Sequence, residues 1–120
     1  MPIAVSTLAP KVSELAQLDD LAASIEDTAR DERLLARAVR RLRSGRAKGR
    51  SWDELLTDEP QPGALALVGR VLSRLTRTSG ELRHTLAAGL RAQGASIGAI
   101  AERFGVSRQR VSALLRRGDR

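Results

Sequence analysis

SIGAIAERFGVSRQRVSALLRR, residues 96–117, is the most informative part of this chain. Ser96 and Ser107 each precede a run of helix-forming residues, and serine is a preferred residue at the start of a helix. Gly105 stands just before the second serine, and glycine tolerates the positive φ that a tight turn needs. We therefore expect two short helices joined by a sharp turn.

The apolar residues of this stretch predict a buried side beneath both helices. Ala101 is small, as required where two helices touch, and Val106 is placed to anchor the turn in the core. The predicted core positions of the motif are Ala101, Phe104, Gly105, Val106, Val111 and Leu114. The opposite face of the second helix is then left with polar and basic side chains that no core requires.

The segment resembles the helix-turn-helix of bacterial transcription regulators. It is especially similar to region four of sigma factors and to the DNA-binding domain of resolvases and invertases. The matching residues are Ile100, Ala101, Phe104, Gly105, Val106, Ser107, Arg108, Gln109 and Val111. The resemblance covers residues 96–117 most closely and implies binding of double-stranded DNA.

In those families the start of the second helix contacts base edges in the major groove. By position, this implies base contacts for Arg108, Gln109 and Ser112. Arginine suits guanine O6 and N7, and glutamine suits adenine N6 and N7. The residues expected at phosphates are Ser96, Ser107, Arg110, Arg116 and Arg117. For Arg110 and Arg117, a solvated helix face is the alternative interpretation.

The charge distribution also favours a polyanionic partner. Residues 1–60 carry 10 basic and 11 acidic side chains, a net charge of −1, whereas residues 61–120 carry 11 basic and 3 acidic, a net charge of +8. Residues 37–50 add seven basic side chains and no acid. Arg46, Lys48 and Arg50 of this run are candidate accessory DNA contacts, or else a solvated helix end.

The composition predicts an all-α chain, since alanine, leucine, arginine and glutamate dominate it and β-branched runs are absent. We expect a flexible arm over residues 1–10, a long helical segment over 11–43, support helices over 44–78, the DNA-binding region over 79–117 and a tail over 118–120. Ser51 and Glu54 form a capping box that starts a short helix, and Gly94 is expected to end the helix before the motif. Thr78 and Glu81 resemble a second capping box, which predicts a helix start there.

The long segment has a helical seam, and whether it is one helix or breaks near Asp19-Asp20 stays open. Its positions are Leu21, Ile25, Thr28, Glu32, Leu35, Val39 and Leu42. The seam either packs on the chain's own domain or pairs with a second copy; the second interpretation predicts a homodimer, the usual way such motifs bind two half-sites.

The region before the motif has two interpretations. Ser51, Trp52 and Leu55 parallel Ser96, Ile97 and Ile100, so residues 44–78 are either a degenerate second helix-turn-helix or ordinary support helices. In both interpretations Trp52 is expected in the core.

Several function classes are disfavoured by the residues that are missing. The chain has no cysteine and one histidine, His84, which we expect to be structural; neither a catalytic constellation nor a metal or cofactor site is expected. No signal peptide or membrane span is apparent, so the expected location is the cytoplasm, at the nucleoid.

We expect a sequence-specific transcription regulator and no enzyme. The alternatives are a nucleoid-associated or architectural DNA-binding protein, and an interaction protein that contacts RNA polymerase or another regulator.

Overall fold

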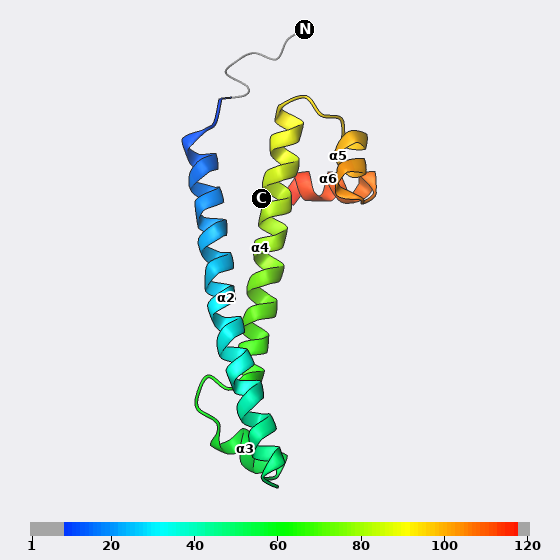
Figure 1. The fold of residues 1–120 in the computed structure, drawn as a ribbon. Coiled ribbons are helices and arrows are strands. Elements are labelled where there is room, and N and C mark those ends of the chain that lie inside the picture. The colour runs from blue at the N-terminus through cyan, green and yellow to red at the C-terminus, as the bar shows by residue number, and fades with distance from the viewer. Residues whose placement is uncertain (1–8, 118–120) are drawn as a thin grey trace. The chain divides into compact units, whose positions relative to one another are not determined.

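The computed structural model describes residues 9–117, in which five α-helices and no β-strand occur (Figure 1). The helices are α2 (Val12–Ala47), α3 (Trp52–Asp58), α4 (Ala64–Ala92), α5 (Ile97–Phe104) and α6 (Arg108–Arg117). The predicted all-α class and the long helix near the N-terminus are confirmed. Most of the predicted arm, residues 1–8, and the whole predicted tail, residues 118–120, lie outside the described residues.

Two helices are longer than the sequence predicted. α2 passes through Asp19-Asp20 without a break and continues to Ala47. α4 passes through Thr78 and Glu81, so the predicted helix start at that second capping box is wrong. The Thr78 hydroxyl caps nothing, because it is buried and lies 2.8 Å from the Ser24 hydroxyl oxygen.

The described residues form two compact units. Residues 22–78 make up the hairpin unit, and residues 9–21 together with 79–117 make up the C-terminal unit. The helices α2 and α4 contribute to both. No helix within residues 9–117 is both long enough and apolar enough to cross a membrane.

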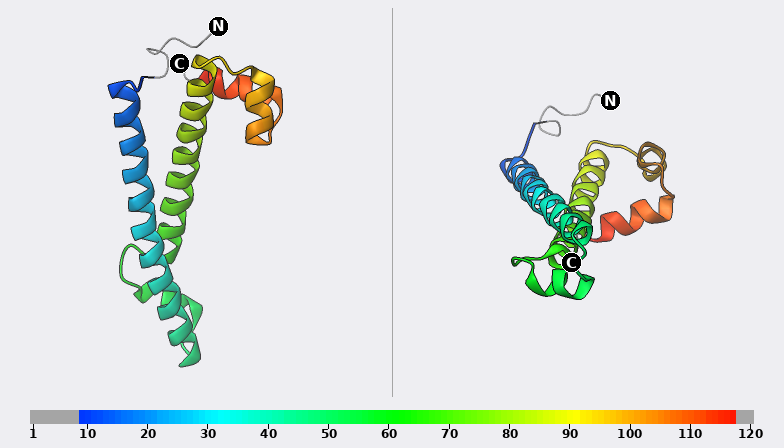
Figure 2. Two further views of the ribbon diagram at one scale, coloured as in Figure 1. Left: turned by 45° about the horizontal axis from the view of Figure 1, so that its top comes forward. Right: turned by 60° about the horizontal axis from the view of Figure 1, so that its bottom comes forward.

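In the hairpin unit, α2 and α4 lie side by side and run in opposite directions (Figures 1 and 2). The inward positions, each buried or half-buried, are Ser24, Thr28, Asp31, Leu35, Ala38, Leu42 and Gly45 on α2 and Ala64, Leu67, Val71, Arg74 and Thr78 on α4. On both helices these positions recur in steps of three and four. This spacing is typical of two helices that pack along a coiled-coil seam.

The seam predicted from the sequence is wrong at every second position. Thr28, Leu35 and Leu42 do point inward, but Ile25 and Val39 are exposed. The positions one residue earlier, Ser24, Asp31 and Ala38, point inward in place of Ile25, Glu32 and Val39. Thr28, Leu35 and Leu42 of the predicted seam are thus used within the chain, whereas Ile25, Glu32 and Val39 are left exposed.

Small and polar side chains hold this seam together because α4 supplies their partners. The Asp31 carboxylate accepts from the Arg74 guanidinium at 2.8 Å and has Arg70 at 3.8 Å. The Ser24 hydroxyl is 2.8 Å from that of Thr78 on α4, while the Thr28 hydroxyl donates within α2 to the Ser24 carbonyl at 2.9 Å. Ala38 packs against Ala64 and Leu67, and its small size lets the two helices approach closely.

The short helix α3 begins as the sequence predicted. The Ser51 hydroxyl accepts from the Glu54 backbone N–H at 3.1 Å, and the Glu54 carboxylate accepts from the Ser51 N–H at 3.2 Å. The Ser51 hydroxyl, and then its backbone amide, holds the pKa of Glu54 below the usual value for a glutamate. Leu55 packs over Gly45 of α2, where a Cβ would collide with the leucine side chain. Glycine at position 45 therefore lets α3 fold back onto the end of α2.

In the C-terminal unit, α4 ends shortly before the two short helices α5 and α6. α4 ends at Ala92, and Gly94 has a φ of +98°, which confirms it as the residue that terminates the helix. The N–H groups of Gly94 and Ala95 donate to the carbonyls of Arg91 and Leu90, at 3.1 and 3.0 Å. The chain then turns sharply toward Ser96.

Candidate nucleic-acid interface

Helix α5 is fixed at both ends by the residues that the sequence singled out. The Ser96 hydroxyl accepts from the Ala99 N–H at 3.0 Å, which caps the N-terminus. At the other end Gly105 adopts the left-handed conformation, with φ +66° and ψ +34°. A residue with a Cβ pays a conformational cost there, so glycine is the natural choice.

The turn between α5 and α6 consists of Gly105, Val106 and Ser107. The Val106 N–H donates to the Ala101 carbonyl at 3.0 Å, which closes the end of α5. The Ser107 hydroxyl then accepts from the Arg110 N–H at 3.1 Å and caps α6. Figure 2 shows α6 crossing α5 at a steep angle in both views.

A small apolar core supports the two helices from α4. Its fully buried members are Ala87 of α4, Ile100 and Ala101 of α5 and Val111 of α6. Phe104 and Val106 are half-buried against this cluster, and Leu114 is buried. Thus Ala101, Val111 and Leu114 are buried as predicted, Phe104 and Val106 are half-buried, and Gly105 is exposed in the turn.

The first turn of α6 faces away from that core. Ser107, Arg108, Gln109 and Arg110 are all exposed, and Ser112 is half-buried. α6 carries four arginines and no acidic residue, so this surface is strongly positive. The hydrogen-bonding side chains of Arg108 and Gln109 are adjacent and available for a ligand outside the protein.

The Arg108 side chain lies close to α5 at Gly98. A Cβ placed on Gly98 would lie 3.1 Å from Nη2 of Arg108, so the guanidinium rests over the first turn of α5. The absence of a side chain at Gly98 makes this approach possible. This glycine was not singled out as a functional position from the sequence, because its role depends on a contact between two helices.

The arginines predicted at phosphates have different surroundings. The Arg117 guanidinium lies over Gly80 of α4, where a Cβ would collide with it. Arg110 lines a hollow of about 200 Å³ together with Phe104 and Val106. Arg116 is exposed, as is Ser96 at the start of α5. Arg110, Arg116 and Arg117 are thus all exposed, but Arg117 would have to leave α4 to reach a phosphate.

His84 is a structural residue that holds α6 in place. Its Nδ1 lies 2.8 Å from the Leu114 carbonyl and donates to it. The imidazole therefore ties the end of α6 to α4. The half-buried position of His84 agrees with the expected structural role, but the sequence did not indicate its partner.

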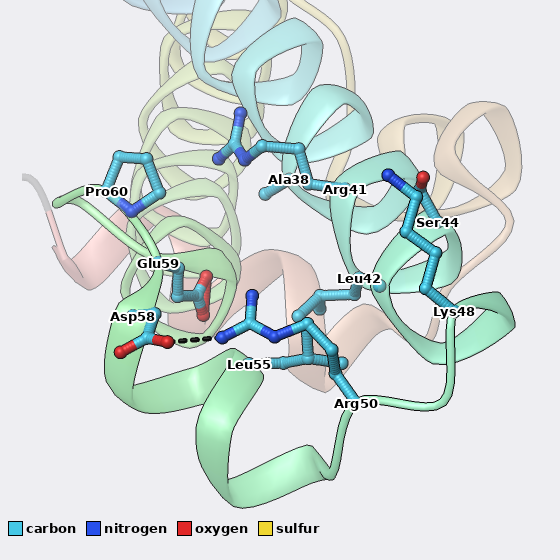
Figure 3. Close-up of a pocket in the computed structure, with 11 residues that line it drawn as sticks. Ala38, Arg41, Leu42, Ser44, Lys48, Arg50, Leu55, Asp58, Glu59 and Pro60 are labelled. Carbon is cyan, nitrogen blue, oxygen red and sulfur yellow. Dashed lines mark hydrogen bonds and ion pairs between the residues drawn. The ribbon is translucent and has the colours of Figure 1, made fainter.

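The basic end of α2 and the loop after it belong to the hairpin unit, and two of their cations have partners there. Arg46 lies 5.2 Å from the centre of the Trp52 ring and donates to the Arg50 carbonyl at 2.6 Å. Arg50 forms an ion pair with Asp58, drawn as a dashed line in Figure 3. Lys48 lines the cavity of about 270 Å³ shown there, together with Leu42 and other residues. Two of the three candidate accessory cations are thus engaged within the protein.

The position of Trp52 contradicts the prediction that it lies in the core, and the surroundings of α3 do not favour a degenerate second helix-turn-helix. Trp52 is 58% exposed, so the expectation that it lies in the core is wrong. Its ring is covered by Arg46 instead, and Leu55 supplies the buried contact of α3. In addition, the first six residues of α4, Ala64–Gly69, carry no charge, unlike the start of α6. We therefore treat α3 as part of the hairpin unit.

Two further results bear on function. Within residues 9–117, no three histidine, aspartate or glutamate side chains lie close enough together to hold a metal ion. Comparisons of the chain with protein-family models, with curated proteins and with solved structures found no match.

Proposed function

We propose that this chain is a transcription regulator that binds double-stranded DNA through a helix-turn-helix formed by α5 and α6. The observation that carries the proposal is the first turn of α6, where Ser107, Arg108, Gln109 and Arg110 are exposed while Val111 is completely buried. A short helix held in this way presents its N-terminal side chains to a groove, as the second helix of such motifs does.

In this proposal Arg108 and Gln109 contact base edges. Arg108 is exposed beside Gly98, and a guanidinium suits the O6 and N7 acceptors of guanine. Ser112 is half-buried and one turn further along, so it contacts a base only if the helix lies deep in the groove.

With α6 in the groove, Ser96 and Arg116 are the residues proposed to contact phosphates. Ser96 begins α5, and the exposed N-terminus of a helix of eight residues offers backbone N–H groups to an anion. Arg116 is free on the surface near the end of α6. Contacts of this kind set orientation and affinity without selecting sequence.

The test is a binding titration with a duplex selected from a random pool, a scrambled duplex and a salt series. A regulator binds the selected duplex far more tightly than the scrambled one, typically by 10³-fold or more. Similar affinity for both duplexes with a steep salt dependence would indicate an architectural DNA-binding protein instead. No binding at low salt would reject DNA as the ligand and favour a protein partner such as RNA polymerase.

Variants assign the roles within the motif. Arg108→Ala and Gln109→Ala are expected to lose about 1–3 kcal/mol on the selected duplex and to relax base choice at one position. Arg116→Ala is expected to weaken both duplexes equally and to lower the salt slope by about one. Arg77→Ala is the matched control. It removes the same charge from an exposed position on α4 within the hairpin unit.

A further inference from the structure

The hairpin unit has a second apolar stripe that its own seam does not use. On α4 this stripe consists of Leu65, Val68, Leu72 and Leu75, again in steps of three and four. All four are exposed, Leu65 by 76% and Leu72 by 59%. A helix with two heptad stripes is suited to pack against two neighbouring helices, and the hairpin unit supplies only one of them.

α2 carries a matching stripe beside its inward positions. Its members are Ala22, Ile25, Ala29, Glu32, Ala36, Val39 and Arg43. Ile25 and Val39 are about half exposed, at 46% and 53%. The alanines between them are small enough for another helix to approach closely.

The two stripes lie on the same side of the hairpin. Each follows directly after the inward positions of its own helix, Leu65 after Ala64 and Ile25 after Ser24. In each helix the stripe is therefore rotated from the inward positions in the same sense along the chain. Because α2 and α4 run in opposite directions, these two rotated stripes lie next to each other on one side of the hairpin. We call this combined surface the outer face.

The charges of α2 indicate what covers the outer face. Within the hairpin unit, residues 22–32 of α2 contain three exposed acidic side chains and one arginine, since Asp31 is buried against Arg74, whereas residues 33–47 contain six arginines and no acid. A second copy lying in the opposite direction sets the acidic half of one α2 against the basic half of the other. A copy lying in the same direction with α2 against α2 would set like charges together, which is repulsive.

We propose that the outer face is the interface of a homodimer, in which two hairpin units pack in opposite directions around a two-fold axis perpendicular to α2. Such an interface is self-complementary, as two-fold symmetry requires. The proposal does not depend on DNA binding, and its test uses protein alone.

The test begins with the mass of the full-length chain in solution. Light scattering during gel filtration is expected to give about 26 kDa, twice the 13.0 kDa of one chain. Leu72→Glu is expected to weaken the dimer by at least about 30-fold, because it buries a charge at the centre of the face in both copies. Helix content should be retained, since the side chain is exposed in the monomer.

The matched control is Ser73→Glu, which introduces the same charge at the next, equally exposed position but points away from the outer face. It is expected to leave the dimer intact. A monomeric wild-type chain at about 100 µM, or equal dimerisation of Leu72→Glu and wild type, would overturn the proposal. Loss of the dimer in both variants would also overturn it, because charge and not the outer face would then decide association.

Cross-linking tests the orientation. The chain has no cysteine, so Ala22→Cys and Arg43→Cys each introduce a unique thiol. The two positions are about 32 Å apart along one helix. With a short bismaleimide, a mixture of the two variants is expected to cross-link, and neither variant alone. Efficient cross-linking within either variant alone would contradict the opposite directions of the two copies.

Discussion

Replacement of Gly105 by alanine tests the turn on which the interface depends. Gly105 has φ +66°, and a Cβ built there meets no atom within 4 Å. The substitution is therefore free of steric collisions with neighbours, and its cost is the left-handed backbone conformation alone. For a residue with a Cβ this cost is about 1–2 kcal/mol.

The expected change can be measured by urea denaturation followed by circular dichroism. With a urea dependence of about 2 kcal/mol/M, a loss of 1–2 kcal/mol lowers the midpoint by about 0.5–1 M. Gly105→Asn should lose less, because asparagine tolerates this conformation better than alanine. Gly105→Val should lose more, and its binding to duplex DNA should weaken because the angle between α5 and α6 is no longer held.

A second glycine gives a control of opposite sign. Gly69 lies within α4, and a Cβ there also meets no atom within 4 Å. Gly69→Ala is expected to raise stability by about 0.5–1 kcal/mol, since glycine is unfavourable in a helix interior. The reasoning is refuted if Gly105→Ala leaves the midpoint unchanged, or if both substitutions shift it in the same direction.

Three further predictions concern residues that stabilise one unit or the other through contacts within that unit. His84→Ala should lower stability by about 1 kcal/mol and weaken DNA binding, because the hydrogen bond that ties the Leu114 carbonyl to α4 is lost; equal stability and affinity in the variant would show the contact to be unimportant. Asp31→Ala should cost about 2 kcal/mol in thermal or urea denaturation, because Arg74 loses a partly buried charged partner, and an unchanged midpoint would contradict this. Since its capping contacts lower the pKa of Glu54 in the folded chain, its ionised form contributes stability above the usual glutamate pKa of about 4.3. That contribution is lost as the pH falls through the folded-state pKa; the stability difference between wild type and Glu54→Gln should therefore shrink between pH 6 and pH 3, and a constant difference would contradict it.

Local signals in the sequence predicted much of the C-terminal unit. Ser96, Gly105 and Ser107 act through hydrogen bonds and backbone angles within a few residues, so their positions alone indicate the caps and the turn. The Ser51–Glu54 capping box is local in the same sense. The contacts of Arg108 with Gly98 and of Arg117 with Gly80 join different helices, and nothing in the local pattern indicates them.

The hairpin unit shows where such signals fail. Thr78 and Glu81 have the spacing of a capping box, yet α4 continues through them because Thr78 is buried beside Ser24. Hydrophobicity alone predicts that Ile25 and Val39 of α2 point inward. The inward places go to smaller or polar residues because α4 supplies their partners, and the larger apolar residues are left on the outer face.

The central claim is that the first turn of α6 contacts DNA, and an NMR titration of the labelled full-length chain with its selected duplex tests it most directly. The account predicts that the largest changes in amide chemical shift fall within residues 107–112, with a second, smaller group at residues 96–98. It is contradicted if these amides stay unchanged while the duplex binds, or if the changes concentrate at residues 46–50 of the basic loop.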